Sequence, residues 1–454
     1  MSSMLKGCTP WPQGFVDHYW AAGYWRGNTL DNLLRDWALR YGPRAALVHG
    51  GTRLTYAALN RRADRMAAAF RLRGLRPGQR VVVQLPGAPE FVVTVFALMR
   101  AGLVPVLCPL SLREPEIPDI VRLTQAVGYV GPSVHNGFDH SAMAARIAAQ
   151  WPFLRRVFTV EPPGTSSPYG GLTTDPSGCQ YSPLDTLDSP PGPALAPSAD
   201  RVAFFTLSAA VGDTPRLVPR THNDYACQLR AAAELVPLAE TDVYLAALPA
   251  ESELALGCPG ILGVLAGGGT VVLAEGQEPA AHLSLIERER VTLTSLSPEA
   301  ARAWLDELPA DQADLSSLRL LQVVGGTPLP RAAAERLGAA LGCRSQSVLA
   351  LPEGLLVLPG GEDRHGTTAL TAHSHPLPPG DETRVIGSDG TEVPDGQPGE
   401  LLVRGPHTVR GYYRAPEQNA VSFTPEGYFR TGVRAARTCG GRLLVTGRIT
   451  DVPD

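Results

Sequence analysis

Strand-like and helix-like segments alternate through the first 195 residues, and this alternation limits the fold more than any other feature. The apolar run RVVVQLP at 80–86 leads into a helical pattern at 88–101, which Gly102 ends, and the apolar run VPVLCPL follows at 104–110. Buried apolar strands separated by helices are typical of a parallel sheet that is covered by helices. The sequence therefore predicts an α/β fold.

A second set of alternating segments follows from about residue 201 to 360, and RVAFFTL at 201–207 is its first expected strand. The stretch 161–200 between the two sets is rich in Pro, Ser and Gly, which predicts a surface linker. From about 370 to 447, short strands surround turns such as Ser388-Asp389-Gly390, which indicates a small β-barrel or a β-rich layer. The domains that we expect are 1–195, 196–365 and 366–447, with 448–454 as a truncated hinge.

Charge and cysteine usage exclude several classes of protein. A net charge of −4 favours neither nucleic acid nor an anionic membrane surface as a partner. The seven cysteines include no CxxC pair, so we expect free thiols rather than a disulfide framework or a zinc site. The first residues contain no apolar signal-peptide core, and no apolar run is long enough to cross a membrane. These features predict a cytoplasmic protein.

Several motifs together resemble one known family. They are WPQGFVDHYWAAGYW at 11–25, PRTHNDY at 219–225, LRLLQVVGG at 318–326, PEGLL at 352–356 and GELLVRGPHTVRGYYRAPEQNAVSF at 399–423. In this order they resemble the adenylate-forming superfamily, and within it the stand-alone 2,3-dihydroxybenzoate– and salicylate–AMP ligases. The resemblance covers essentially the whole chain.

The resemblance implies a fold and a reaction. The fold is the large N-terminal domain of an adenylate-forming enzyme, with two α/β subdomains and a small β-barrel. Relatives first join a carboxylate to AMP from ATP and then pass the acyl group to a thiol. They also have a small C-terminal domain after a Gly-Arg pair, here Gly447-Arg448. Because the chain stops at Asp454, we expect that domain to be absent.

The stretch that aligns with the family's phosphate-binding loop departs from the family pattern. Glycines in such a loop let backbone N–H groups approach phosphate, hydroxyls donate to it, and a lysine adds charge. Here three glycine positions carry Ala209, Ala210 and Asp213, and Arg216 replaces the lysine. An aspartate would repel a triphosphate, so we expect a degenerate site. Its residues are Ser208, Ala209, Ala210, Asp213, Thr214 and Arg216.

Two further nucleotide positions and a metal position come from the resemblance. Val433 stands where relatives hold both ribose hydroxyls with a carboxylate, and valine accepts no hydrogen bond. Arg448 belongs to the hinge pair. Glu353 in PEGLL matches the glutamate that holds Mg²⁺ in relatives, although a lone glutamate is also common as a capping or surface group.

The acyl pocket implied by the resemblance is altered as well. Ser252 and Glu253 replace a histidine and an asparagine that contact the substrate ring, and Cys258 replaces a serine of the pocket wall. Glu253 either points inward, where it favours a hydrogen-bond-donating or cationic substrate, or it has swung to solvent. Retained His222 is either a general base or a structural histidine. Gly325 and Gly326 complete the substrate-binding set.

These substitutions lead to three hypotheses. The first is an enzyme of natural-product biosynthesis that has lost adenylation and carries out ATP-independent acyl transfer, condensation or cyclisation. His222, Glu253, Cys258 and Glu353 are its candidate catalytic residues. The second is a non-catalytic protein that binds a carrier protein or a partner ligase. The third is an active aryl-acid–AMP ligase whose C-terminal domain is removed or supplied in trans.

The first hypothesis fixes the expected cofactors and partners. It needs neither the ATP nor the Mg²⁺ of the family. Its partner is a small aryl or acyl substrate, free or presented by a carrier protein, with no nucleic acid and no membrane. A homodimer is a further expectation.

Overall fold

The computed structural model describes most of the chain. The described residues are 4–161, 171–193, 195, 198–208, 215–274, 276–307, 313–324, 331–357, 367–368, 380–438 and 443–449. The chain divides into two compact units, each built from separate stretches of sequence. The first unit contains residues 1–8, 27–43 and 54–222, and the second contains 9–26, 44–53 and 223–454. The predicted domain boundaries at 195, 365 and 447 stay a prediction.

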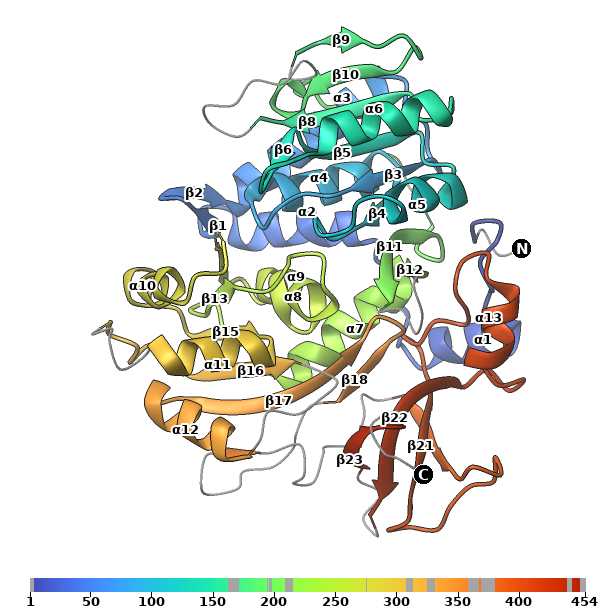
Figure 1. The fold of residues 1–454 in the computed structure, drawn as a ribbon, viewed down its shortest axis with the longest axis vertical. Coiled ribbons are helices and arrows are strands. Elements are labelled where there is room, and N and C mark those ends of the chain that lie inside the picture. The colour runs from blue at the N-terminus through green and yellow to red at the C-terminus, as the bar shows by residue number, and fades with distance from the viewer. Residues whose placement is uncertain are drawn as a thin grey trace. The chain divides into compact units, whose positions relative to one another are not determined.

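The first unit is built on the predicted parallel sheet (Figure 1). Helix α4 (Pro89–Arg100) packs against β4, and α6 (His140–Gln150) packs against β5 and β8. The apolar run RVVV forms β3 with parallel neighbours on both sides, as expected for a strand buried on both faces. The strand order is β12 (Arg216–Thr221), β11 (Val202–Ser208), β4 (Val104–Leu107), β3 (Arg80–Val83), β5 (Gly128–Pro132), β8 (Arg156–Val160), β10 (Gln180–Pro183) and β9 (Thr173–Thr174).

Two findings in this unit differ from a simple reading of the sequence. Strand β11, expected as the first strand of the second α/β set, is hydrogen-bonded to β4 in the first unit. Residues 216–221, which begin at Arg216 of the predicted phosphate-binding stretch, form the antiparallel edge strand β12, in which Leu217 and Val218 are buried. The helices α2 (Leu30–Tyr41), α3 (Tyr56–Leu72) and α5 (Glu116–Thr124) complete the unit with the hairpin β6 (Val134–His135) and β7 (Phe138–Asp139) and the short η1 (Leu184–Thr186).

The second unit contains another mainly parallel sheet and a smaller antiparallel one. In the larger sheet, α11 (Pro298–Glu307) packs on β15 and β16, and α12 (Arg331–Leu341) packs on β17 (Figure 1). Its strands are β18 (Leu355–Val357), β17 (Arg344–Leu351), β16 (Leu320–Val324), β15 (Leu293–Leu296), β13 (Val243–Ala246), β14 (Thr270–Leu273) and β1 (Ala45–His49), in that order, and β19 (Thr367–Thr368) pairs with β17. Strand β2 (Thr52–Thr55) crosses the boundary between the units in sequence.

The smaller sheet lies where the β-rich layer was expected. It is antiparallel, in the order β20 (Glu382–Ile386), β21 (Pro398–Arg404), β22 (Phe429–Arg437) and β23 (Leu443–Arg448). The remaining helices of the second unit are α1 (Gln13–Ala21), α7 (His222–Leu235), whose first residue belongs to the first unit, α8 (Glu253–Gly257), α9 (Gly260–Ala266), α10 (Pro279–Glu289) and α13 (Pro416–Ser422).

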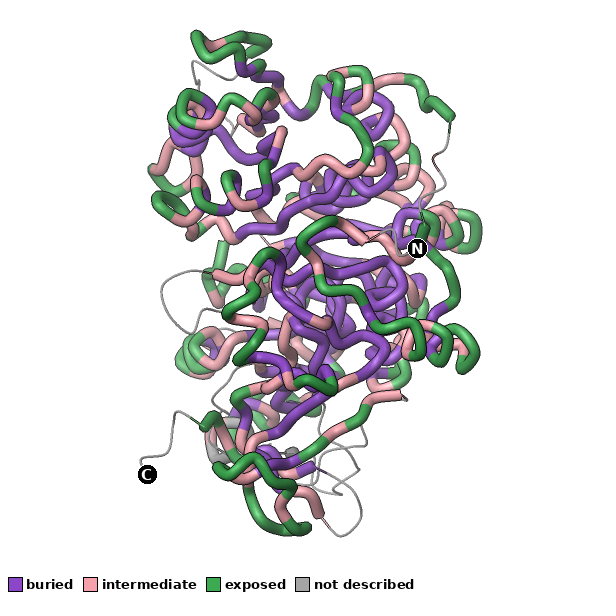
Figure 2. The backbone as a smooth tube through the Cα atoms, turned by 90° about the vertical axis from the view of Figure 1, so that its right-hand side faces the viewer, coloured by how far each residue is buried: buried purple, intermediate pink, exposed green. Residues whose placement is uncertain are grey.

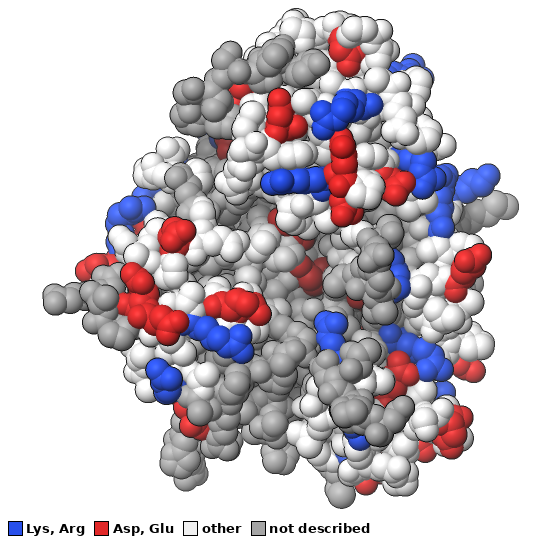
Figure 3. All heavy atoms as spheres, viewed as in Figure 1, with Lys and Arg blue, Asp and Glu red and all other residues white. Residues whose placement is uncertain are grey.

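Burial and surface charge follow the expected pattern. Buried residues concentrate on the central strands and on the helix faces against them (Figure 2). Basic and acidic side chains are interspersed on the face in Figure 3. The described part of the chain contains no helix long and apolar enough to cross a membrane. Its six cysteines are free thiols, as expected, and Cys439 lies outside the described residues.

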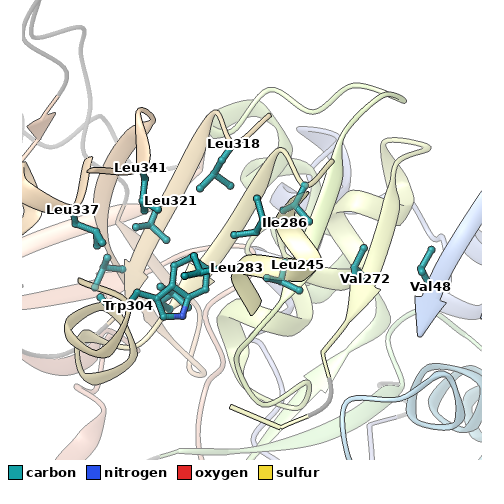
Figure 4. Close-up of a cluster of buried hydrophobic side chains, with 14 residues drawn as sticks. Val48, Leu245, Val272, Leu283, Ile286, Trp304, Leu318, Leu321, Leu337 and Leu341 are labelled. Atoms are coloured by element: carbon teal, nitrogen blue, oxygen red, sulfur yellow. The ribbon is translucent and has the colours of Figure 1, made fainter. Parts of the chain in front are cut away.

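The core of the larger sheet in the second unit centres on Trp304. This side chain comes from α11, is fully buried, and belongs to a cluster with Leu283, Ile286 and Leu321 (Figure 4). Val48 of β1 joins the same cluster, although it precedes the other members by about two hundred residues. Apolar burial of this kind stabilises a fold by roughly 25 cal/mol per Å².

Candidate functional site

Two of the predicted substrate-binding residues lie together in the second unit. Gln228 on α7 donates from Nε2 to Glu253 Oε1, and its Nε2 lies 3.1 Å from Cys258 Sγ. Cys258 Sγ is 3.7 Å from the same Glu253 oxygen. These three side chains, which we call the Glu253 cluster, are buried, and Glu253 is only 6% exposed. The alternative of a solvent-facing Glu253 is therefore not what the structure shows.

Polar groups adjoin the Glu253 cluster along the chain. Ser252 is the N-cap of α8, yet its Oγ is buried and has no hydrogen-bond partner among the described residues. A buried hydroxyl without a partner is unusual in folded proteins, and a bound ligand is one way to satisfy it. Burial also raises the pKa of Glu251 to about 7. Perturbed carboxyl groups of this kind are common at functional sites.

Glu353 is held in place from two directions. It lies in the turn between β17 and β18 and is 2% exposed. The hydroxyl of Tyr412 donates to Glu353 Oε1 at 2.7 Å, and the backbone N–H of Val409 donates to the Glu353 carbonyl at 2.9 Å. The next residue, Gly354, has φ +107°, and a Cβ there would lie 2.1 Å from the His407 carbonyl oxygen. Glycine is therefore required beside this carboxylate.

A single carboxylate is compatible with one mode of magnesium binding. The described residues contain no group of three or more potential metal ligands. Mg²⁺ commonly takes only one or two protein carboxylates and completes its shell with waters and substrate phosphates. Glu353 thus fits a Mg²⁺ ion that binds together with a nucleotide. In that case Glu353 would be the protein ligand of the ion.

The predicted phosphate-binding stretch connects two strands of the first unit. Ser208 ends β11, Arg216 begins β12, and the two residues are opposite each other in the hairpin register. Arg216 is half-buried, so a cation stands at the base of the connection. The intervening positions, with Ala209, Ala210, Asp213 and Thr214, lie outside the described residues, and so do Gly325 and Gly326 of the substrate-binding set.

The predicted ribose and hinge positions are neighbours in the smaller sheet. Val433 on β22 pairs with Arg448 on β23. Val433 is buried, with its N–H donating to Thr431 Oγ1 at 3.1 Å, whereas Arg448 is exposed. The structure thus brings Val433 and Arg448 together, as it does Ser208 and Arg216.

His222 belongs to the first unit, apart from the other candidate catalytic residues, which are in the second. The backbone N–H of Leu30, at the start of α2, donates to His222 Nδ1 at 3.1 Å. The ring also borders a cavity of about 40 Å³, much smaller than the several hundred Å³ of a typical ligand pocket. Burial lowers the pKa of His222 to about 4. These contacts favour the structural alternative, in which the neutral ring caps α2.

Replacement of His222 should destabilise the protein in a pH-dependent way. We expect His222→Ala to lower the unfolding free energy by about 1 kcal/mol at pH 7, because α2 loses the acceptor for an N-terminal N–H group. The folded-state pKa lies below the unfolded value near 6.5. Acidification from about pH 6.5 to 4 therefore protonates His222 in the unfolded chain only. The difference in unfolding free energy between wild type and His222→Ala becomes smaller as a result. Urea unfolding at pH 7 and pH 5 measures both effects, and an equal difference at the two pH values would contradict this role.

Two residues of the candidate sites were missed in the sequence. In the sequence, Gln228 is separated from Glu253 by the strand β13, and Tyr412 is separated from Glu353 by the strands β18 to β21. Neither Gln228 nor Tyr412 belongs to a sequence motif that indicates which residue it contacts. Spatial contact between distant positions, which a single sequence does not reveal, is what identifies them.

The fold and these sites define a class of protein. The family model for AMP-binding enzymes matches residues 34–413. The chain belongs to the AMP-binding enzyme family.

Its relatives include ligases of aryl acids. The chain is 39% identical over 99% of its length to the 2,3-dihydroxybenzoate-AMP ligase of Bacillus subtilis, and it covers 80% of that protein. It is also 39% identical to the salicyl-AMP ligase / salicyl-S-ArCP synthetase of Mycobacterium tuberculosis, over 99% of this chain and 78% of that one. The apo structure of Mycobacterium smegmatis MbtA superimposes with a TM-score of 0.86 at 36% identity and covers 99% of this chain and 81% of that one.

These matches correct the first functional hypothesis. The expectation that the chain has given up adenylation and works as an ATP-independent enzyme is wrong, because AMP ligases match it at 39% identity over nearly its whole length. The inference rested on the substituted positions alone, whereas the match covers 99% of the chain. The same matches give no support to the non-catalytic alternative and favour the third hypothesis, an active aryl-acid–AMP ligase.

Proposed function

We propose that this chain is an aryl-acid–AMP ligase. A carboxylate oxygen of a small aryl acid attacks the α-phosphorus of ATP, the bond to the β-phosphate oxygen breaks, and pyrophosphate leaves with the electron pair. A thiol then attacks the acyl carbon, and AMP leaves. The observation that carries the proposal is the match to AMP ligases over 99% of the chain.

The described residues support parts of this reaction. Glu353 is a buried, oriented carboxylate and would hold Mg²⁺ together with the nucleotide phosphates. The bound ion would neutralise part of the phosphate charge. Arg216 keeps a positive charge beside the phosphate-binding stretch, as a planar fork rather than as an ammonium group. Ser252 and the Glu253 cluster would contact the aryl acid.

ATP–pyrophosphate exchange tests this function directly. Incubation with benzoates, salicylates and 2,3-dihydroxybenzoate should transfer label from pyrophosphate into ATP only when an acceptable acid and Mg²⁺ are present. The opposite expectation from the sequence, that neither ATP nor Mg²⁺ is used, stays a prediction that the same assay decides. Absence of exchange with every acid would contradict the proposal. Thiol acceptance by a carrier protein, a homodimer and a cytoplasmic location are further parts of the proposal, and each needs its own measurement.

The Glu253 cluster should set which aryl acid is preferred. A buried carboxylate accepts hydrogen bonds, so acids with a hydroxyl or amino donor on the ring should react about tenfold faster than benzoate, the difference expected for one such bond. We expect Glu253→Gln to reduce this ratio of kcat/KM values. Cys258→Ser keeps a donor beside the carboxylate and should preserve the ratio. A ratio unchanged in Glu253→Gln would exclude the carboxylate from substrate recognition.

A further inference from the structure

A second site is hollowed into the smaller antiparallel sheet. A cavity of about 510 Å³ opens there, within the size range of small-molecule pockets. Its walls come from β20, β21, β22 and the residue after β23. None of its lining residues belongs to the predicted substrate, phosphate, ribose or metal positions. The described lining residues that carry the argument are Ile386, Pro398, Glu400, Arg430, Arg434 and Ile449.

The charged groups of this cavity do not cancel. Arg430 Nη1 lies 2.7 Å from Glu400 Oε2, and Arg434 is directly opposite Glu400 in the strand register. The described lining residues thus include two arginines and one glutamate, which gives them a net charge of +1 (two minus one). Among the described residues, no ion pair engages Arg434. A guanidinium in this position is suited to bind a carboxylate or phosphate through two parallel hydrogen bonds.

Apart from the hydroxyl of Ser388, the remaining described lining residues are apolar or have no side chain. Ile386 ends β20, Pro398 begins β21, and Ile449 follows β23 with 42% of its surface exposed. Gly387, Gly390 and Gly399 also line the cavity, and at Gly390 a Cβ would meet nothing within 4 Å. A ligand here would therefore meet apolar groups on its body and positive charge at one end.

We infer that this cavity binds a small organic anion. Arg434 holds its carboxylate or phosphate group, Arg430 adds positive charge, and Ile386 and Ile449 contact its apolar body. The site is separate from the proposed ligase reaction, and its existence does not depend on that reaction.

Calorimetry on the whole chain tests the inference with three probes. Phenyl phosphate and hexanoate represent the two oxyanions, and hexanamide is the uncharged counterpart of hexanoate. We expect at least one anion to bind, and hexanamide to bind at least tenfold more weakly than hexanoate where hexanoate is the ligand. The anion that binds more tightly identifies the headgroup. Failure of both anions to bind, or equal binding of hexanoate and hexanamide, would overturn the proposal.

Variants locate the binding. Arg434→Gln should weaken binding of the anion by about 10- to 100-fold, the range for a hydrogen bond to a charged group. Glu400→Gln should strengthen binding of the anion, because the net charge of the described lining residues rises from +1 to +2. Arg437→Gln is the matched control, since Arg437 is also on β22 but pairs with Glu392 at 2.8 Å outside the cavity.

Hydrogen exchange provides an independent readout. Anion-dependent protection should appear in residues 386–400 and 430–434. Thermal unfolding of each variant shows whether it is folded. Unchanged affinity in folded Arg434→Gln, weaker binding in folded Glu400→Gln, or protection elsewhere would each contradict the site. If Arg434→Gln does not fold, protection in wild type and the Glu400→Gln result still decide the question.

Discussion

Glu353→Gln should lower the rate of ATP–pyrophosphate exchange by roughly 10²–10³-fold, the loss typical when one preorganised electrostatic group is removed from an active site. Gln has nearly the same shape, so the turn between β17 and β18 should survive. What disappears is the negative charge that would hold Mg²⁺ and its phosphates. The variant should also need a higher Mg²⁺ concentration for half-maximal exchange. Exchange assays over a Mg²⁺ titration measure both changes.

Two further variants separate charge from packing. Tyr412→Phe removes the hydrogen bond to Glu353 at 2.7 Å but keeps the carboxylate, so we expect a loss of about tenfold, the equivalent of one hydrogen bond. Glu392→Gln removes an exposed glutamate paired with Arg437 and should leave exchange unchanged. Full activity and an unchanged Mg²⁺ requirement in Glu353→Gln would exclude Glu353 as the metal ligand.

Trp304→Ala should have the largest effect on stability, a loss of about 3–5 kcal/mol in the free energy of unfolding. The indole is fully buried between α10 and the sheet, in a cluster that joins residues from 48 to 341. Its removal takes apolar surface from the core and leaves a cavity that the surrounding strands cannot readily close. Urea denaturation should show the change as a lower midpoint.

Trp20 provides a matched comparison because it is also a helical tryptophan of the second unit but is 42% exposed. We expect Trp20→Ala to change the unfolding free energy by no more than about 0.5 kcal/mol, as for most surface substitutions. Similar losses in the two variants would show that burial of Trp304 is not what stabilises this unit.

The periodic segments of the fold could be predicted from the sequence. The run RVVV at 80–83 and the helix at 89–100 form as expected, because burial on both strand faces and helical spacing leave local patterns. Which strands pair with each other was harder to predict from the sequence. The run RVAFFTL was correctly predicted as a strand. Its pairing with β4 could not be predicted, because the two strands are about a hundred residues apart in the sequence. Strand β12 was missed because Pro219 and three polar residues interrupt its apolar pattern.

The candidate site was predicted in part. Ser252, Glu253 and Cys258 lie within one short segment, and in the structure Cys258 Sγ is 3.7 Å from a Glu253 oxygen. Whether Glu253 faces inward depends on Gln228, which approaches from another helix. For His222, the residue was identified from the sequence but its role was not. A histidine next to a helix start has the same sequence whether its ring binds substrate or caps a neighbouring helix, and only the contact with Leu30 distinguishes the two.

The pairing of β1 with β14 has a consequence for synthesis on the ribosome. Leu47 pairs with Val271, so the first strand of the larger sheet is made long before its neighbour. At typical translation rates of 5–20 residues per second, the interval is roughly 10–45 s. During that time the edge of β1 that pairs with β14 lacks its native neighbour and is open to chaperones or to aggregation. Slower translation before residue 271 would lengthen that exposure, and codon choice in this region should therefore affect the yield of folded protein.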